Sequence, residues 1–348
     1  MAYEFRPTRR SFLRHSAAAA FAAGAAGAWR APLRAEGSRS YLLGTGTTGG
    51  TYYPVGVAIA TLVKVKLEPK AKIAMSAITS AGSGENLKPL REDQVQFAIL
   101  QGLWGAHARA GSGPLASVGP QAHLRGISML WPNVEHFIVR AEYAASGTVA
   151  DLQLLAGKGF SIGKRNSGTE GSNRHILAGL GIDPEAAFDL AYLGYGPSAD
   201  ALINGKIAGM STPAGPPVSA VTRAFAALGK DIAILSFTPE QITRANADFD
   251  LWTPYTLPAG TYPEQGHDVA TIAQPNFLAV RADVDDGAVY EITRAMHENL
   301  PFLHNIHKAT RAISLEAALG GLPVPLHKGA LRYYQERELQ IPGALLGG

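Results

Sequence analysis

The chain lacks cysteine, long hydrophobic runs and a high density of charge, and each absence excludes a class of protein. With no Cys among 348 residues, disulfides, thiolate metal ligands and a cysteine nucleophile are excluded. Charged residues make up only 17% of the chain. No stretch approaches the roughly 18 uninterrupted apolar residues that indicate a membrane-spanning helix. We therefore expect a soluble globular protein after its N-terminal segment.

The N-terminal segment, residues 1–35, has the order of an export signal. An Arg-Arg pair at positions 9 and 10 precedes a weakly apolar, Ala- and Gly-rich stretch over 16–28, and Ala35 supplies a small residue at the expected cleavage point. This order is typical of the twin-arginine signal of bacterial secretion. A disordered basic tail and an uncleaved anchor are the alternatives. We expect cleavage near Ala35 and a periplasmic location.

Cleavage changes the charge of the protein. Residues 1–35 contain six Arg and one Glu, so Lys+Arg falls from 31 to 25 and Asp+Glu from 28 to 27. The net charge becomes about −2 instead of +3, because the positive charge belongs to the signal. No basic run with interleaved aromatic residues follows, and we expect no nucleic-acid partner.

Short apolar runs alternate with helical patterns along the rest of the chain. The pattern predicts strands over 41–43, 72–79 and 96–100 and helices over 54–66, 85–92 and 103–110; a second block repeats it with strands over 159–162, 207–210 and 232–235 and helices over 169–180, 198–204 and up to 228. Such alternation is typical of doubly wound α/β sheets.

Two extended runs, 134–140 and 276–281, flank the second block, and the pattern predicts helices in the tail over 287–300 and 315–334. The predicted fold is therefore α/β with two lobes, each built on a doubly wound sheet and joined by two crossing strands. Lobe I comprises residues 36–133 plus 282–348, and lobe II comprises residues 134–281. A ligand is expected in the cleft between them, with hinge closure around it.

Three loops rich in Gly, Ser and Thr each lead into a predicted helix: Gly44–Gly56, Ser80–Asn86 and Asn166–Gly171. A helix N-terminus presents unpaired N–H groups and a partial positive charge, and anions bind there readily. Ordinary helix capping explains any one of these loops. Because the loops come from both lobes, and doubly wound sheets place such loops at one edge, we expect them to converge on a single anion-binding cleft.

Nucleotide, metal and catalytic sites have weaker support. The run from Gly44 to Gly49 matches G-x-G-x-x-G, a weak signal alone, and no Lys-Ser or Lys-Thr ends it. His304 and His307 form an isolated pair without two further ligands. No G-x-S-x-G motif and no nucleophile with an evident base appear. We expect no cofactor, no metal and no enzymatic activity.

The runs GTGTTGGTYYPVGVAIATLV, SAGSGENLKPL and QVQFAILQG resemble the TAXI family of solute-binding proteins, the receptors of one class of TRAP transporters. FSIGKRNSGTEGSNRHIL, LGYGPSADALINGKIAGMSTPAGPP and NFLAVRADVDDGAVYEITRAMHEN extend the resemblance over most of residues 41–310. It implies a periplasmic-binding-protein fold, a carboxylate ligand such as glutamate or 2-oxoglutarate, and TRAP membrane permease subunits as partners.

The resemblance also implies a set of ligand-binding residues in the matching motifs. They are Thr48, Thr51, Tyr52, Ser80, Ser83, Gln101, Asn166, Ser167, Gly168, Thr169, Pro213, Ala214 and Gly215. Arg165 is added as a carboxylate partner, because a guanidinium binds a carboxylate in bidentate fashion. Trp104 and Trp131 match no residue with a family role.

The predicted function is that of an extracytoplasmic receptor that captures a small organic anion, a carboxylate or an amino acid, and delivers it to a TRAP-type permease. A receptor for an ABC importer, a ligand-sensing partner of a membrane kinase and an exported enzyme on the same fold are the alternatives.

Overall fold

The computed structural model describes residues 37–247 and 249–347, so the predicted signal over residues 1–35 lies outside the described residues. The first sheet has the strand order β10-β11-β3-β1-β2, with β4 paired to β11. Its strands are β1 (Arg39–Gly44), β2 (Ile73–Ile78), β3 (Phe97–Gln101), β4 (Leu124–Val134), β10 (Thr253–Leu257) and β11 (Val269–Arg281). β1 pairs in parallel with β2 and β3, and β11 runs antiparallel to β3.

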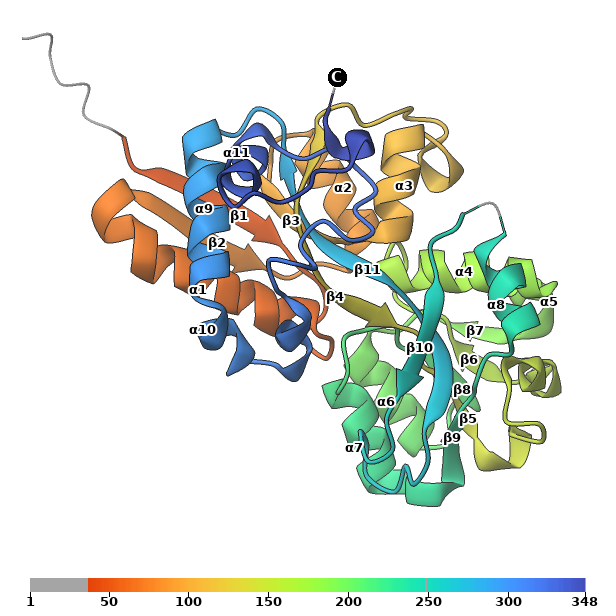
Figure 1. Ribbon diagram of the computed structural model, residues 1–348. Helices are drawn as coiled ribbons and strands as arrows, with labels where there is room; N and C mark the ends of the chain where they lie inside the picture. Colours follow the sequence, from red (N-terminus) through yellow and green to blue (C-terminus); the bar gives the residue numbers. More distant parts are fainter. Residues whose placement is uncertain (1–36, 248, 348) are drawn as a thin grey trace, which may run out of the picture. The chain divides into compact units, whose positions relative to one another are not determined.

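β4 and β11 are the two strands that cross between the lobes, and they lie side by side as an antiparallel pair (Figure 1). Where they leave the first sheet they bond to the second lobe. The Val134 N–H donates to the carbonyl of Ala214 at 3.0 Å, and the carbonyl of Ala270 accepts from the N–H of Phe237 at 2.8 Å. The predicted pair of crossing strands is therefore confirmed, and β11, which is antiparallel to β3, makes the first sheet mixed.

The second sheet has the order β7-β6-β8-β5-β9. Its strands are β5 (Phe137–Arg140), β6 (Gly159–Ser161), β7 (Asp189–Ala191), β8 (Gly209–Ser211) and β9 (Ile232–Ile234). β6 pairs in parallel with β7 and β8, whereas β5 is antiparallel to β8 and β9. The predicted two-lobed α/β fold with two sheets is confirmed.

The helices cover both faces of each sheet. They are α1 (Tyr52–Ala71), α2 (Ser83–Arg91), α3 (Gly102–Ala110), α4 (Gly168–Leu180), α5 (Pro184–Ala187), α6 (Tyr195–Ile203), α7 (Ser219–Leu228), α8 (Pro239–Asn246), α9 (Asp286–Glu298), α10 (Leu300–His304) and α11 (Lys328–Glu336). Short 3-10 turns lie at Gly113–Leu115, Ala141–Tyr143, Val149–Leu155, Gly229–Asp231, Lys308–Ala312 and Gly343–Leu345.

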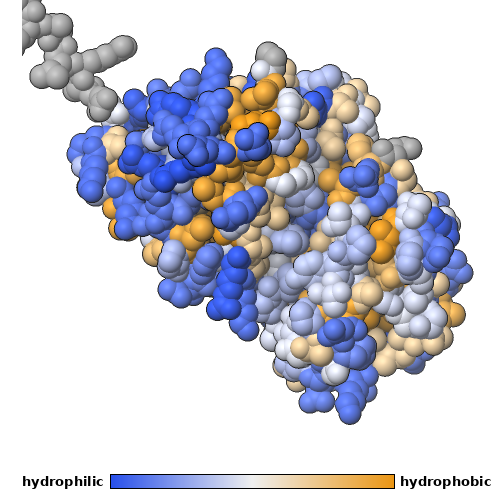
Figure 2. Space-filling model, viewed as in Figure 1, coloured by the Kyte–Doolittle hydropathy of each residue, from blue (hydrophilic) through white to orange (hydrophobic). Residues whose placement is uncertain are grey.

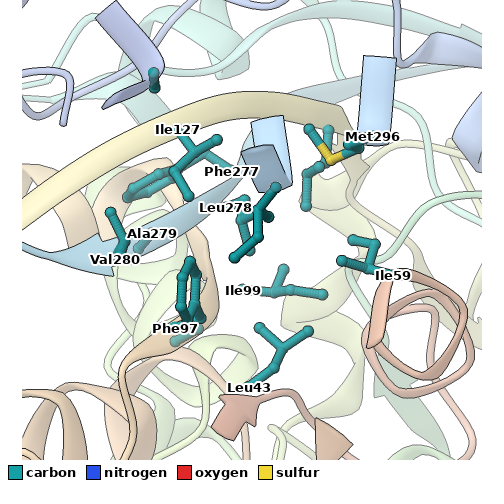
Figure 3. Packing of buried hydrophobic residues seen from close by; sticks show 14 of the residues in the cluster. Leu43, Ile59, Phe97, Ile99, Ile127, Phe277, Leu278, Ala279, Val280 and Met296 are labelled. Carbon is teal, nitrogen blue, oxygen red and sulfur yellow. The ribbon is translucent and has the colours of Figure 1, made fainter. Parts of the chain in front are cut away.

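The core of the first lobe forms where α1 and α9 cover the central strands. Leu43 of β1 is fully buried on the side of α1, while the next residue, Gly44, lies against Asn86 of α2, because successive strand residues point to opposite faces. Figure 3 shows Leu43, Ile99 and Leu278 from three neighbouring strands together with Ile59 of α1 and Met296 of α9.

In the second lobe the same alternation separates two cores. Phe137 and Val139 of β5 pack with Phe160 on the face covered by α4. Ile138, between them in the chain, packs on the other face with Met210 and with α6 and α7. Complete burial of one such side chain contributes about 1.5–3 kcal/mol.

The predicted helix over residues 315–334 is largely wrong. Only Lys328–Glu336 is helical there, and the preceding residues form turns and extended chain. Gly320 and Gly321 weaken a helix, and prolines at 323 and 325 remove the backbone donors that it needs. α8 and β10 were not predicted from the sequence, and β4 already starts at Leu124, ahead of the predicted strand start at residue 134.

Among the described residues, no helix combines the length and the apolar character required to cross a membrane. The face drawn in Figure 2 carries hydrophilic side chains over the outer parts of both lobes, with hydrophobic patches between them.

A buried carboxyl lies where β4 ends and the chain passes into the second lobe. Glu135 is fully buried, one of its oxygens accepts the indole N–H of Trp252 at 3.1 Å, and the side-chain amide of Gln274 lies beside the carboxyl. Burial raises the pKa of Glu135 from 4.5 to about 8. The folded protein therefore keeps this carboxyl protonated at neutral pH, whereas the unfolded chain ionises it.

This difference predicts a falling stability as the pH rises. Between pH 4.5 and about 8 the folded state binds one proton more than the unfolded state at Glu135, so this contribution is complete below pH 4.5 and is lost by about pH 8. Burial lowers the pKa of His136 from 6.5 to about 4. This residue makes the stability rise with pH, but only below pH 6.5. Urea unfolding between pH 6.5 and 8 should show a steeper loss for the natural protein than for Glu135→Gln. Parallel curves would contradict the assignment.

Candidate functional site

A pocket lies between the two lobes, at the ends of β1, β2 and β3 and opposite the start of α4. Its cavity volume is about 40 Å³, enough for roughly three water molecules. The lining residues come from six separate loops and helix starts. They are Gly46, Thr47, Gly50, Thr51, Tyr52, Ala81, Gly82, Ser83, Gln101, Lys164, Ser167, Gly168, Thr169, Gly194, Tyr195, Pro213 and Ala214.

Four helices begin at this pocket: α1, α2, α4 and α6. The N-cap residues Thr51, Gly82 and Gly194 of α1, α2 and α6 make no side-chain capping hydrogen bond. The first N–H groups of these three helices are thus left for another acceptor. Since each helix start also carries about half a positive charge, the pocket is suited to an anion.

The first loop is held in place from both sides. The carbonyl of Thr45 accepts the Asn86 amide at 2.8 Å and the Ser80 hydroxyl at 3.0 Å. Gly44 is required beside it, because a Cβ at this position would lie 2.8 Å from the Asn86 oxygen. Ser80 therefore supports the loop from behind and does not line the pocket.

Tyr52 and Ser83 belong to a hydrogen-bonded network that runs from the pocket to the crossing strands. The Tyr52 hydroxyl donates to the amide oxygen of Asn276 at 2.5 Å and lies 3.5 Å from the hydroxyl of Ser83, and Asn276 donates to Asn133 at 3.1 Å. Burial raises the pKa of Tyr52 far above its usual 10. The phenol is therefore neutral, and its orientation is fixed by the strands that join the lobes.

Gln101, at the end of β3, is a pocket-lining side chain that is buried without a complete set of hydrogen-bond partners. Its backbone N–H donates to the hydroxyl of Ser83 at 3.0 Å. The side chain is only 3% exposed, and its amide oxygen has no hydrogen-bond partner among the described groups. That oxygen would lie 2.6 Å from a Cβ at Gly168, so it faces the start of α4 across the cleft. A buried amide without a partner is costly, which makes Gln101 available to a bound molecule.

The second lobe contributes a chain of hydroxyl groups. The Tyr195 hydroxyl donates to the carbonyl of Pro213 at 2.5 Å and lies 2.8 Å from the hydroxyl of Thr169. Burial raises the pKa of Tyr195 well above 10, so it stays neutral. Ser167 caps α4 by accepting the N–H of Glu170 at 3.0 Å, which leaves its own hydroxyl hydrogen free to donate.

Little side-chain charge lines the pocket. Lys164 is the one cation among the lining residues, and no His, Asp or Glu occurs in that set. Arg165 is exposed, and its guanidinium stacks on the ring of Tyr192 with the Cζ atom 3.6 Å from the ring centre. Arg174 forms ion pairs with Glu170 and Glu185 at 3.2 and 2.6 Å. Neither arginine reaches the pocket.

The two lobes touch around the pocket. The Thr51 hydroxyl donates to the carbonyl of Gly215 at 2.8 Å in a buried hydrogen bond, and the Ser219 hydroxyl donates to the carbonyl of Gly49 at 3.0 Å. The first bond joins the first loop to the turn that precedes α7, and the second joins it to the first residue of α7. The structure therefore shows the cleft closed.

The structure brings nine of the residues predicted from the sequence to the pocket wall. They are Thr51, Tyr52, Ser83, Gln101, Ser167, Gly168, Thr169, Pro213 and Ala214. Five others lie outside the lining: Thr48 is exposed on the loop, Ser80 supports the loop, Arg165 stacks on Tyr192, the Asn166 side chain is exposed, and Gly215 accepts the bond from Thr51.

Three lining residues, Tyr195, Thr47 and Lys164, were not predicted as site residues from the sequence. Tyr195 follows Gly194 at the start of α6, and this Gly-Tyr-Gly-Pro run is a fourth Gly-rich helix entrance of the kind already noted three times. Thr47 precedes the predicted Thr48 directly, and only the turn geometry decides which of the two faces the cleft. Trp104 and Trp131 do not line the pocket.

No group of three or more His, Asp or Glu side chains suited to a metal ion occurs in the part of the chain that the structure describes. His304 ends α10, and His307 accepts the N–H of Ala309 at 3.1 Å at the start of the next turn.

Two mixed sheets, crossing strands and a cleft at the sheet edges define the two-lobed α/β fold of periplasmic binding proteins. A profile of the NMT1-like family matches residues 43–337, and the chain belongs to this family.

Solved structures are similar to the chain at low identity. The periplasmic aliphatic sulphonate binding protein SsuA from Escherichia coli is 12% identical, over 86% of this chain and 83% of that chain, with a TM-score of 0.43. The alkanesulfonate-binding protein SsuA from Xanthomonas axonopodis pv. citri, bound to MOPS, is 13% identical, over 86% of this chain and 90% of that chain, with a TM-score of 0.42. MatC from Rhodopseudomonas palustris with bound malate is 13% identical, over 78% of this chain and 88% of that chain, with a TM-score of 0.48.

Removal of the Tyr195 hydroxyl should lower the stability of the protein measurably, because this hydroxyl makes two hydrogen bonds. Tyr195→Phe leaves the carbonyl of Pro213 without its donor in a buried setting, which should lower the free energy of unfolding by about 1–3 kcal/mol. Urea denaturation measures it. The control is Tyr255→Phe, because the Tyr255 hydroxyl has no hydrogen bond within the described residues. This variant should lose much less free energy of unfolding. Equal losses in the two variants would refute the role of the Tyr195 hydroxyl.

Proposed function

We propose that the chain is an exported, extracytoplasmic receptor that captures a small organic anion in the cleft and delivers it to a membrane permease. The observation that carries this proposal is the convergence of uncapped helix starts from both lobes on a small closed pocket. Backbone N–H groups at such starts bind carboxylates and other oxyanions without needing an opposing side-chain charge.

The polar groups of the pocket suit binding rather than catalysis. The hydroxyls of Ser83, Ser167 and Thr169 have no imidazole or carboxylate among the lining residues to take up a proton. Tyr52 and Tyr195 are held neutral by burial. These groups hold a ligand through hydrogen bonds, and we infer that the chain is not an enzyme.

The transport partner and the ligand class rest on the sequence motifs. Their resemblance to TAXI receptors supports a TRAP-type permease as the partner, with a carboxylate or amino acid such as glutamate or 2-oxoglutarate as ligand. The signal-like order of residues 1–35 supports export to the periplasm. Lys164 at the pocket and the helix starts supply the positive potential that such an anion needs.

Isothermal titration calorimetry with glutamate, 2-oxoglutarate, malate and a short alkanesulfonate tests the proposal, with glutamine as the neutral control. We expect one-site binding of at least one anion and weaker or no binding of glutamine. Absence of binding by every anion, or equal affinity for glutamine and glutamate, would contradict an anion receptor.

Gln101→Leu tests the pocket itself. Gln101→Leu keeps the approximate size of the side chain but removes the amide oxygen that can accept from an ammonium or hydroxyl group of the ligand, so the affinity for an anion that carries such a donor should fall about tenfold. Gln121→Leu is the matched control, because Gln121 is also buried with an unpaired amide oxygen but lies outside the pocket. Titrations in which the two variants lose affinity equally would remove Gln101 from the site.

A further inference from the structure

Trp104 occupies the place where the two lobes meet beside the pocket. It lies on α3 of the first lobe, is 6% exposed and does not line the cavity. Both α2 and α3 contact α4 of the second lobe here. The indole is therefore part of the closed interface and not of the ligand pocket.

Two glycines from different lobes lie against the indole. A Cβ at Gly84 of α2 would be 2.8 Å from the Cη2 atom of Trp104 and 2.5 Å from the carbonyl oxygen of Asn166. A Cβ at Gly171 of α4 would be 2.7 Å from Cζ2 and 2.9 Å from Nε1 of the same ring. Real Cβ atoms do not approach other atoms this closely, so the closed lobes leave no room for a side chain at either position.

Backbone conformation does not explain these two glycines. Neither Gly84 nor Gly171 has a positive φ, and both lie inside helices. Glycine weakens a helix by about 1 kcal/mol relative to alanine. At Gly171 the indole comes from the opposite lobe, whereas at Gly84 the indole comes from the same lobe and the Asn166 carbonyl from the opposite one. Contacts across the closed cleft therefore leave no room for a side chain at either glycine.

The indole N–H of Trp104 opposes closure, whereas burial of the indole ring favours it. Nε1 of Trp104 is buried and has no acceptor among the described groups. Closure buries the apolar ring, which is favourable, but leaves this N–H without the water that it binds when the lobes separate. The two terms oppose each other, so the interface can open.

We propose that Gly84, Gly171 and Trp104 form a latch that sets the equilibrium between the open and closed lobes. The latch determines how tightly the pocket holds its ligand without contacting the ligand. This last step rests on the proposed receptor function, because the apparent affinity falls with the fraction of molecules that reach the closed state.

Gly171→Ala tests the latch. Alanine favours helix α4, yet its methyl group meets the indole when the lobes close, so the closed fraction should fall about tenfold or more. The chain has no Cys, so spin labels at Val65→Cys and Leu154→Cys attach at one site in each lobe, where the natural side chains are 62% and 48% exposed. Electron–electron double resonance on the full chain gives the distance distribution, with and without the compounds of the titration panel.

We expect the natural protein to show a component at the separation of the closed structure. Gly171→Ala and Gly84→Ala should both lose most of it, and Trp104→Leu added to Gly171→Ala should restore it, because leucine lacks the ring atoms that the methyl meets. Gly287→Ala is the control, a first-turn glycine of α9 far from Trp104 in the chain whose Cβ meets only the Asp285 side chain at 3.2 Å.

Distributions of Gly171→Ala and Gly84→Ala that match the natural protein would overturn the proposal, as would a natural protein with no closed component under any condition. Circular dichroism confirms that each variant is folded. A panel in which no compound binds would contradict the receptor function but leave the difference between Gly171→Ala and Gly287→Ala intact, so the two failures are distinguishable.

Discussion

The N–H groups at the starts of α1, α2 and α6, which no capping side chain occupies, are the constraint on which the cleft depends. α1, α2, α4 and α6 begin at the same pocket, and three of them lack a capping side chain. A buried backbone donor needs an acceptor. Closure of the lobes removes this edge from bulk water, so a small acceptor-rich molecule in the pocket would satisfy these donors.

The rest of the fold holds these helix starts together. Tyr52 is tied to Asn276 and, through it, to Asn133 on the crossing strands, while Tyr195 is tied to Pro213 in the second lobe. Each wall of the pocket is thus anchored in its own lobe. The contacts between the walls are single hydrogen bonds, such as Thr51 to Gly215, and tight packing around glycines. An interface of this kind allows hinge motion without disturbing either core.

The sequence predicted the parts of the site that depend on local chemistry. Gly- and Ser-rich loops before apolar-periodic helices mark helix entrances, and their position at sheet edges follows from the α/β pattern. Side-chain direction does not follow: Thr47 rather than Thr48 faces the pocket, and Arg165 turns to stack on Tyr192. The interface around Trp104 depends on contacts between residues that are far apart in the chain, so no local pattern reveals it.

We expect helix starts, and not charged side chains, to hold an anion between the lobes. A crystal structure with the anion that binds most tightly tests it most directly. We expect the anionic group within hydrogen-bond distance of the first-turn N–H groups of α1 and α2 and of the start of α4, with the Gln101 amide oxygen accepting from a donor group elsewhere on the ligand. An anionic group held mainly by arginine side chains, or a ligand in the groove beside Phe249 and Pro275 behind the crossing strands, would contradict it.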